Sequence, residues 1–173
     1  TQTLLNNIQG EVLTEPRVIK FRTGQRKQHW NKNCIALGLA CGFVEPLEST
    51  SIHMVQSGIL RLLRMFPFDG INESYVTEFN QQMSDEFLFI RDFIVLHYHV
   101  TQREDTAFWR HCKTMEIPKS LQHRIDMFKR TGSVFHKTGD LFAENSWTQV
   151  MLGQGLVPEQ YHPIVDMMSD DEL

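Results

Sequence analysis

The chain has 173 residues, a formal charge of -4 and an apolar fraction of 41%. This is enough apolar sequence for the core of one domain, or for a piece of a larger one. The negative charge and the lack of a dense basic run argue against a nucleic-acid-binding surface. There is no charged-then-apolar leader and no apolar run near about eighteen residues, so we expect a cytoplasmic protein without a membrane span.

The hydrophobic pattern predicts a mainly α fold with one small β element. In chain order, it predicts a helix over 3–10, a strand over 16–23, a turn over 24–28, a buried strand over 33–39, helices over 51–66, 74–101, 104–113, 120–130 and 141–152, and an acidic end over 166–173 that could fray. The helix over 74–101 is apolar on several faces, which indicates burial on most sides. A helix of this kind indicates that the chain packs against a larger protein.

The three cysteines, Cys34, Cys41 and Cys112, lack the spacing of a metal or redox site. Cys34 and Cys41 lie within an apolar run, and we expect both to be small core residues. The eight histidines also lack ligand spacing, so we expect no bound metal. His53, just after a predicted helix start, is expected to order that turn.

The segment over 42–53 joins an apolar run to this helix start and reads Gly-Phe-Val-Glu-Pro-Leu-Glu-Ser-Thr-Ser-Ile-His. Ser49, Thr50 and Ser51 are residue types that cap a helix. The unpaired N–H groups of a helix start can hold a small anion. Glu48 lies one or two residues earlier, so the turn offers an acid/base group beside an anion site. The alternative is a solvated carboxylate that favours the helix dipole.

Two blocks of sequence carry a family signature. The first covers residues 30–67 and contains the twelve-residue segment above; the second covers 97–109 and reads His-Tyr-His-Val-Thr-Gln-Arg-Glu-Asp-Thr-Ala-Phe-Trp. Both resemble the flavin-dependent tryptophan halogenase family, in family order and at a family-like separation. The resemblance spans nearly the whole chain and is weakest after about Gly132.

The resemblance implies that residues 1–173 are the C-terminal helical part of a larger α/β fold like that of FAD-dependent monooxygenases. Residues 1–50 would be a strand and loop region against the flavin-binding core, and 51–173 the helical substrate-pocket region. The chain has no Gly-x-Gly-x-x-Gly fingerprint, which the family uses near its N-terminus for the dinucleotide. We therefore expect a C-terminal fragment, inactive alone, that docks on the remainder of the same polypeptide.

The family reaction uses reduced FAD, oxygen and chloride or bromide to produce hypohalous acid, which reaches a separate aromatic substrate; a flavin reductase supplies the reduced flavin. The resemblance implies that Glu48 activates the oxidant or takes the proton of the halogenated ring. It implies that Ser49 helps to position substrate and glutamate, although a simple N-cap role is compatible with this. The backbone amides of Thr50 and Ser51 would bind the halide.

Three further residues receive a flavin role from the resemblance alone. Gly42 permits close backbone approach, either to another strand or to a ligand. In the family this strand passes the flavin, which favours close approach to a ligand and implies flavin contacts from Gly42, Phe43 and Pro46.

Glu45 lies three residues before Glu48, and paired carboxylates can divide acid and base roles. For Glu45 a structural hydrogen bond is the favoured interpretation.

The second block would form one wall of the substrate pocket. Trp109 is a large, flat ring that can stack on an indole or phenol, with Phe108 beside it; without the resemblance, both could be plain core. The resemblance implies that His97, Tyr98 and Glu104 recognise the amino-acid end of tryptophan. His97 replaces the tyrosine typical of enzymes that bind free tryptophan, so indole-like or other aromatic compounds are at least as well supported.

Two alternatives to a halogenase remain open. A non-catalytic helical interaction domain could have kept the fold, as the missing flavin fingerprint suggests. A related flavin monooxygenase could hydroxylate instead, although the turn over 48–51 weighs against this because it is tied to halide-using members.

Overall fold

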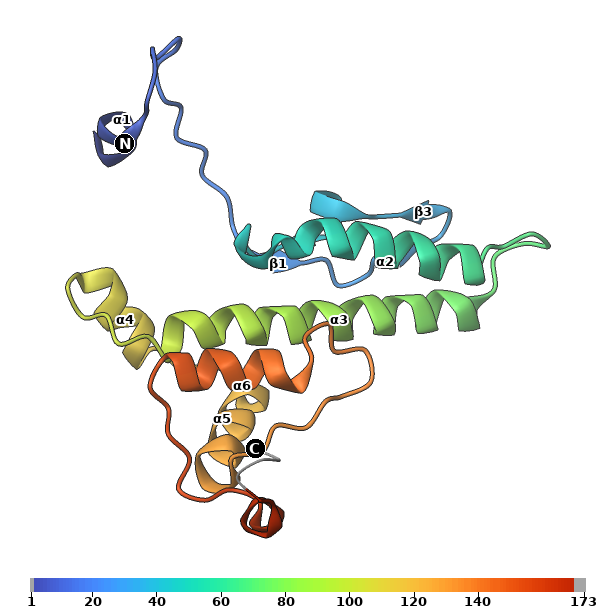
Figure 1. Cartoon of the computed structure of the whole chain (residues 1–173). Helices are drawn as coiled ribbons and strands as arrows, with labels where there is room; N and C mark the ends of the chain where they lie inside the picture. Colours follow the sequence, from blue (N-terminus) through green and yellow to red (C-terminus); the bar gives the residue numbers. More distant parts are fainter. Residues whose placement is uncertain (1, 170–173) are drawn as a thin grey trace.

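The computed structural model describes residues 2–169, and its centre is one long helix. This helix, α3 (Glu73–His99), lies between α2 (Thr50–Arg64) on one side and α6 (Glu144–Gly153) and α5 (Lys119–Thr131) on the other, with α4 (Ala107–Thr114) near its C-terminal end (Figure 1). Short 3-10 helices are η1 (Gly38–Ala40), η2 (Leu47–Ser49) and η3 (Pro163–Met167). The mainly helical fold class is confirmed.

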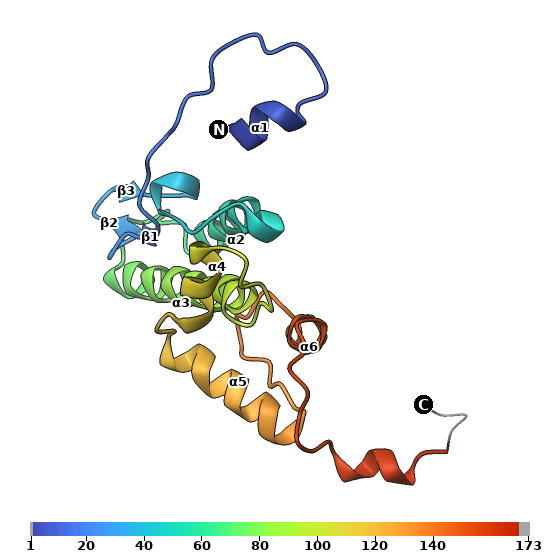
Figure 2. The same cartoon turned by 90° about the vertical axis from the view of Figure 1, so that its left-hand side faces the viewer.

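The β structure consists of two small antiparallel pairs. β1 (Gly24–Gln25) pairs with β4 (Gly42–Phe43), and β2 (Trp30–Asn31) pairs with β3 (Cys34–Ile35). The N-terminal helix α1 (Gln2–Asn7) is joined to β1 by an extended arm, residues 8–23, which stands away from the helical body in both views (Figures 1 and 2).

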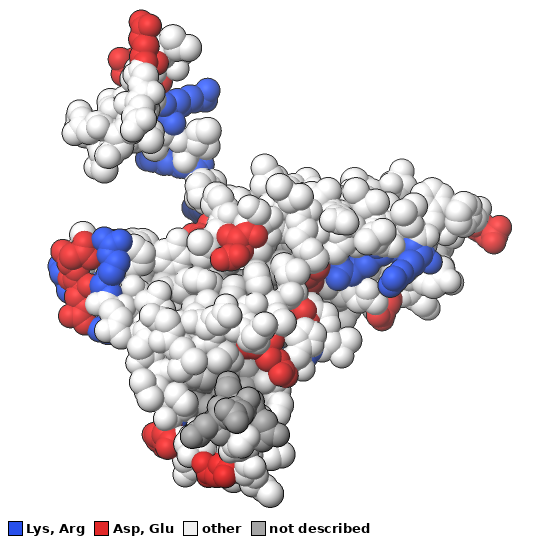
Figure 3. Space-filling view, viewed as in Figure 1, with Lys and Arg blue, Asp and Glu red and all other residues white. Residues whose placement is uncertain are grey.

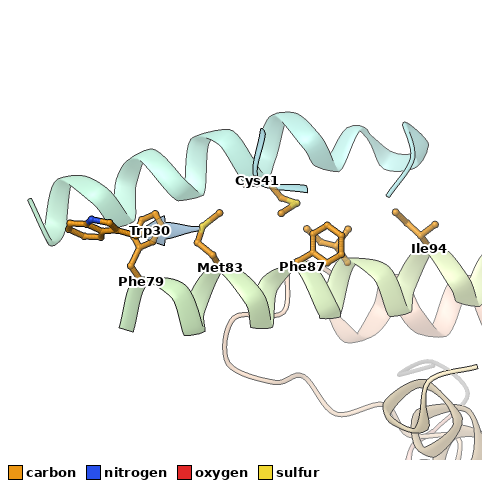
Figure 4. Close-up of a cluster of buried hydrophobic side chains, with 8 residues drawn as sticks. Trp30, Cys41, Phe79, Met83, Phe87 and Ile94 are labelled. Atoms are coloured by element: carbon orange, nitrogen blue, oxygen red, sulfur yellow. The ribbon is translucent and has the colours of Figure 1, made fainter. Parts of the chain in front are cut away.

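Two hydrophobic clusters share α3. The first packs α3 against α2 and the β pairs, and Figure 4 shows its side chains along the helix; its fully buried members include Trp30, Cys41, Phe79, Met83 and Ile90. The second packs the C-terminal half of α3 against α5 and α6, through residues that include Phe93, Leu96, Leu121, Phe128 and Trp147. The predicted burial on most sides is therefore confirmed for the C-terminal half of α3. It is wrong for the N-terminal half, where one face is buried and residues that include Glu73, Tyr75 and Glu78 are exposed.

The five helices predicted over 51–66, 74–101, 104–113, 120–130 and 141–152 all form within a few residues of their predicted bounds. The strand predicted over 16–23 is wrong. This segment lies in the arm, where Val18, Ile19 and Phe21 are exposed. An apolar run becomes a strand only where a neighbour pairs its backbone and covers one face. The turn predicted over 24–28 instead begins with β1.

The strand predicted over 33–39 is also largely wrong, because only Cys34–Ile35 is a strand and the chain then enters η1. Cys34 is exposed on the resulting hairpin, whereas Cys41 is buried, so the core expectation is wrong for Cys34 and confirmed for Cys41. The acidic end predicted over 166–173 begins inside η3, and its residues 170–173 lie outside the described part of the chain. Within residues 2–169, no helix is both long and apolar enough to cross a membrane.

Gly42 lets β4 approach both β1 and α3 closely. A Cβ at this position would lie 2.8 Å from Cε2 of Phe87, 3.0 Å from the carbonyl oxygen of Gly24 and 3.1 Å from Cα of Gln25. Two of these atoms belong to the backbone and cannot rotate away. A side chain at position 42 must therefore push the strand pair away from α3.

We predict that Gly42→Ala lowers the free energy of unfolding by about 1–3 kcal/mol, the usual cost of overpacking. Urea denaturation of the chain measures this. Gly153→Ala is the matched control, because nothing lies within 4 Å of a Cβ there, and its stability should stay the same or rise by up to about 1 kcal/mol. Equal stability of the two variants would contradict the close approach at Gly42.

Candidate active site

The turn that precedes α2 has an unusual backbone. Glu48 (φ 60°, ψ 11°) and Ser49 (φ 52°, ψ 27°) are both left-handed although neither is glycine. Such residues cost on the order of 1–3 kcal/mol each and persist only where their surroundings hold them. Two observed anchors are the Ser49 N–H, which donates to the Pro46 carbonyl oxygen at 3.0 Å, and Thr50, which is 3% exposed.

The start of α2 is not capped by a side chain. Ser49 occupies the N-cap position, as expected, but its hydroxyl makes no capping hydrogen bond. The first amides of a helix, here those of Thr50 and Ser51, have no acceptor within the helix. Ser49 is left-handed and Thr50 right-handed, and an alternation of this kind can turn successive N–H groups toward a common point. This arrangement can hold a small anion.

Glu48 lines a hollow of about 300 Å³ between the turn, α3 and α6. Phe93 of α3 and Phe142, just before α6, form its aromatic wall, and their stacked ring centroids lie 3.7 Å apart. Ser146, Gln149 and Val150 of α6 complete the lining. Glu48 is exposed, so the hollow combines a solvent-accessible carboxylate with a wall of mixed polar and aromatic side chains.

Glu45 and the second sequence block form a separate aromatic cluster. The Tyr98 hydroxyl donates to Oε2 of Glu45 at 2.6 Å, which confirms the structural hydrogen bond expected for Glu45. The rings of Tyr98 and Trp109 are stacked with centroids 5.8 Å apart, and Phe108 contacts both edge-on. The Arg103 guanidinium lies 4.5 Å from the centroid of the Trp109 ring. Phe108 is exposed, so it is not plain core.

The Tyr98 hydroxyl is held in its protonated form. Burial, followed by the hydrogen bond to Glu45 and its charge, raises the pKa of Tyr98 to about 12. At neutral pH the phenol is therefore a donor, and one oxygen of Glu45 is occupied as its acceptor. This contact ties the loop before α2 to the C-terminal end of α3.

His97 and Glu104 lie outside this aromatic cluster. Nδ1 of His97 donates to the Phe93 carbonyl oxygen at 2.8 Å, and the His97 ring packs edge-on against Phe93 with centroids 4.8 Å apart. Glu104 is exposed and forms an ion pair with Lys113. This hydrogen bond to Lys113, together with its charge, holds the pKa of the Glu104 carboxyl below its usual value.

The structure thus divides the predicted residues into two groups, which the loop over 44–49 connects. Glu48 lies with Phe93, whereas Trp109 lies with Tyr98 and Glu45 and does not line the Glu48 hollow. The sequence analysis missed Phe142 and the α6 residues of the hollow. They follow Glu48 by nearly a hundred positions, and no local pattern distinguishes them from ordinary helix residues.

Two of the three residues expected to contact the flavin, Gly42 and Phe43, make close contacts within the chain. The close approach at Gly42 is to β1 and Phe87, which is the strand alternative. The Phe43 ring packs edge-on against Phe21 with centroids 5.1 Å apart, and Pro46 is exposed. Phe43 and Pro46 keep surface that another group can contact. Among residues 2–169, no cluster of three or more His, Cys, Asp or Glu is placed to hold a metal ion.

Comparison with known proteins places this geometry in a family. The chain is 56% identical to Xcc4156, a flavin-dependent halogenase from Xanthomonas campestris, with a TM-score of 0.92 over 99% of this chain and 34% of that one. It is 42% identical to BrvH, a flavin-dependent halogenase from Brevundimonas sp. BAL3, with a TM-score of 0.91 over 97% and 34% of the two chains. It is 33% identical to the tryptophan 7-halogenase RebH of Lentzea aerocolonigenes, over 84% of this chain and 30% of that protein.

The chain therefore spans about a third of the length of these relatives. The family model described as tryptophan halogenase matches residues 1–170. The turn over 48–51, the helical fold and these similarities agree, and the chain belongs to the tryptophan halogenase family.

Proposed function

We propose that this chain is the C-terminal helical part of a flavin-dependent halogenase that uses reduced FAD, oxygen and chloride or bromide to halogenate an indole-like or other aromatic substrate. The observation that carries the proposal is the turn over 48–51, where a carboxylate precedes an uncapped helix start at the edge of an aromatic-walled hollow. Family membership supplies the reaction class. The remainder of the polypeptide would hold most of the flavin, and a flavin reductase would be the redox partner.

Each group of the turn has a distinct role in this proposal. The amides of Thr50 and Ser51 bind the halide, because helix N–H groups attract an anion without offering a nucleophile. Glu48 accepts the proton that leaves the ring or polarises the oxidant, as a positioned general base. The backbone of Ser49 holds these donors and Glu48 in one fixed turn. Reduced flavin, when bound near Phe43 and Pro46, supplies with oxygen the oxidising power for the halide.

The substrate we favour lacks an amino-acid head group. Glu104, the carboxylate that would pair with the ammonium of free tryptophan, is already paired with Lys113. The Tyr98 hydroxyl is engaged with Glu45, and Nδ1 of His97 is engaged with a backbone carbonyl. The polar groups of this wall are thus partnered within the chain. The aromatic faces of Phe108 and Trp109 remain to contact an indole-like ring.

An apolar stripe on α2 supports a role for the rest of the polypeptide. Ile52, Ile59 and Leu63 of α2, together with Phe66 just after its end, recur at helical spacing on the side away from α3, and are 74%, 43%, 62% and 46% exposed. In Figure 3 the upper edge of the surface over α2 is largely white, with a group of basic side chains below it. Contiguous exposed apolar side chains mark interaction sites. Because the relatives are about three times as long, we propose that their remaining fold covers this stripe.

The proposed function leads to three predictions, and the first concerns Glu48 in the full-length polypeptide. With a flavin reductase, oxygen, bromide and a panel of indoles, mass spectrometry should detect brominated product, and Glu48→Gln should lower kcat at least about 100-fold because the general base is lost. Glu116→Gln, at an exposed carboxylate on another loop, is the control and should keep wild-type activity. Full activity of Glu48→Gln would refute its role, and a hydroxylated product would favour the monooxygenase alternative.

The second prediction tests whether Glu45 acts through Tyr98 to support structure. Tyr98→Phe should lower the free energy of unfolding by about 1.5–3 kcal/mol at pH 8, because a hydrogen bond to a carboxylate is lost. The pKa of Tyr98 is raised from 10.0 to about 12 on folding, so this stabilisation is complete below about pH 10 and disappears as the pH rises through about 12. Denaturant unfolding at several pH values measures it, with exposed Tyr75→Phe as control.

The third prediction concerns the stripe on α2. In the full-length polypeptide, Ile59→Asp combined with Leu63→Asp should lower Tm by several degrees, because two apolar contacts are replaced by buried charges. Val157→Asp, at a loop side chain that is 78% exposed, should change Tm little. If the double variant melts like wild type, the stripe faces solvent in the complete protein and the docking proposal is wrong.

A further inference from the structure

One buried carboxylate on α3 holds three side chains of α2. Glu86 is 4% exposed and accepts hydrogen bonds from Nε2 of His53 at 2.9 Å, Oγ of Ser57 at 2.8 Å and Nη1 of Arg61 at 2.5 Å. A buried charge is tolerated only where partners replace its hydration. Glu86 therefore has both oxygens engaged, and all of these partners come from a single neighbouring helix.

The spacing of these partners allows the contact to fix how α2 packs on α3. His53, Ser57 and Arg61 follow one another at four-residue intervals, so they form one row on the face of α2 that packs on α3. Figure 4 shows the two helices side by side. Hydrophobic packing alone is non-directional. A carboxylate that meets a row spanning two turns fixes both the rotation of α2 about its axis and its position along α3.

His53 is the member of this row closest to the proposed halide site. It lies in the first turn of α2, three residues after Thr50 and two after Ser51. No side chain caps this helix start, and the two preceding residues are in the left-handed region. The contact between His53 and Glu86 is thus the side-chain hydrogen bond that anchors the first turn to the buried body of the protein.

We infer that His53 and Glu86 are positioning residues for halide use: through them, α3 sets the place of the Thr50 and Ser51 amides. This inference rests on the proposed function, because it assigns the halide to those amides. Ser57 and Arg61 bind the same carboxylate further along α2 and serve mainly to hold the two helices together. A substitution in this row should therefore change halide binding less, the further it lies from the start of α2.

The test compares three variants of the full-length polypeptide. His53→Leu removes the donor to Glu86, His53→Gln keeps an N–H donor, and Ser57→Ala removes a donor to the same carboxylate one turn further from the site. His53→Leu should raise the KM for bromide about fivefold to tenfold and leave kcat within about twofold. This is less than the full effect of a lost hydrogen bond to a charged group, because the loss reaches the halide only through the position of the helix start. His53→Gln and Ser57→Ala should keep the bromide KM within about twofold. His53 is 38% exposed by side chain, so its variants should fold, which Tm verifies.

Two outcomes would overturn the inference. One is an unchanged bromide KM in His53→Leu, and the other is an equal rise in Ser57→Ala, which would show a general loss of packing. Crystals of the unreacted protein soaked in bromide separate this inference from the proposed function. A wild-type anomalous peak at the Thr50 and Ser51 amides that persists unchanged in His53→Leu refutes the positioning role alone. No peak in wild type refutes the halide site itself, and the inference with it.

Discussion

The packing of neighbours on α3 is the constraint on which the rest of the structure depends. A helix of 27 residues is about 40 Å long. Its N-terminal half is buried on one face, and its C-terminal half is covered on most sides. Two buried carboxylates of α3 each bind a different neighbouring helix and so fix its position. Glu86 binds the row of donors on α2, whereas Asp92 accepts from Ser120 of α5 at 2.5 Å and from Arg91. Apolar burial supplies the driving force, and these polar contacts set the register.

The candidate site has two parts, which the loop before α2 connects. Glu48 of this loop meets the hollow walled by the segment at α6, whereas Glu45 of the same loop meets the aromatic cluster to which α4 contributes Trp109. Two strained residues precede α2, and such strain is stored only in a turn that its surroundings hold. The position of the turn over 48–51 therefore depends on how firmly α2 packs on α3.

The helices were predictable because their apolar periodicity reports burial on one or several faces, and α2 and α3 show this most clearly. The absence of a strand over 16–23 was not predictable, since Val18, Ile19 and Phe21 have the composition of a strand but their segment pairs with no other strand in the described fold. The same limit applied to Cys34, which an apolar run suggested was buried and which a hairpin exposes. Strand formation depends on another segment, so local sequence is a weak guide to it.

The sequence by itself determined the helical framework and the turn in which a carboxylate meets a helix start, because propensity, periodicity and an ordered motif act over a few neighbouring residues. It also carried the family resemblance that the comparisons confirmed. Only the tertiary structure decided three contacts. The Tyr98 hydroxyl donates a hydrogen bond to Glu45, Phe142 lines the hollow beside Glu48, and Glu86 accepts a hydrogen bond from His53 in the first turn of α2. These contacts join positions up to about a hundred residues apart, and packing of the folded chain, rather than any local preference, brings them within hydrogen-bonding or van der Waals distance.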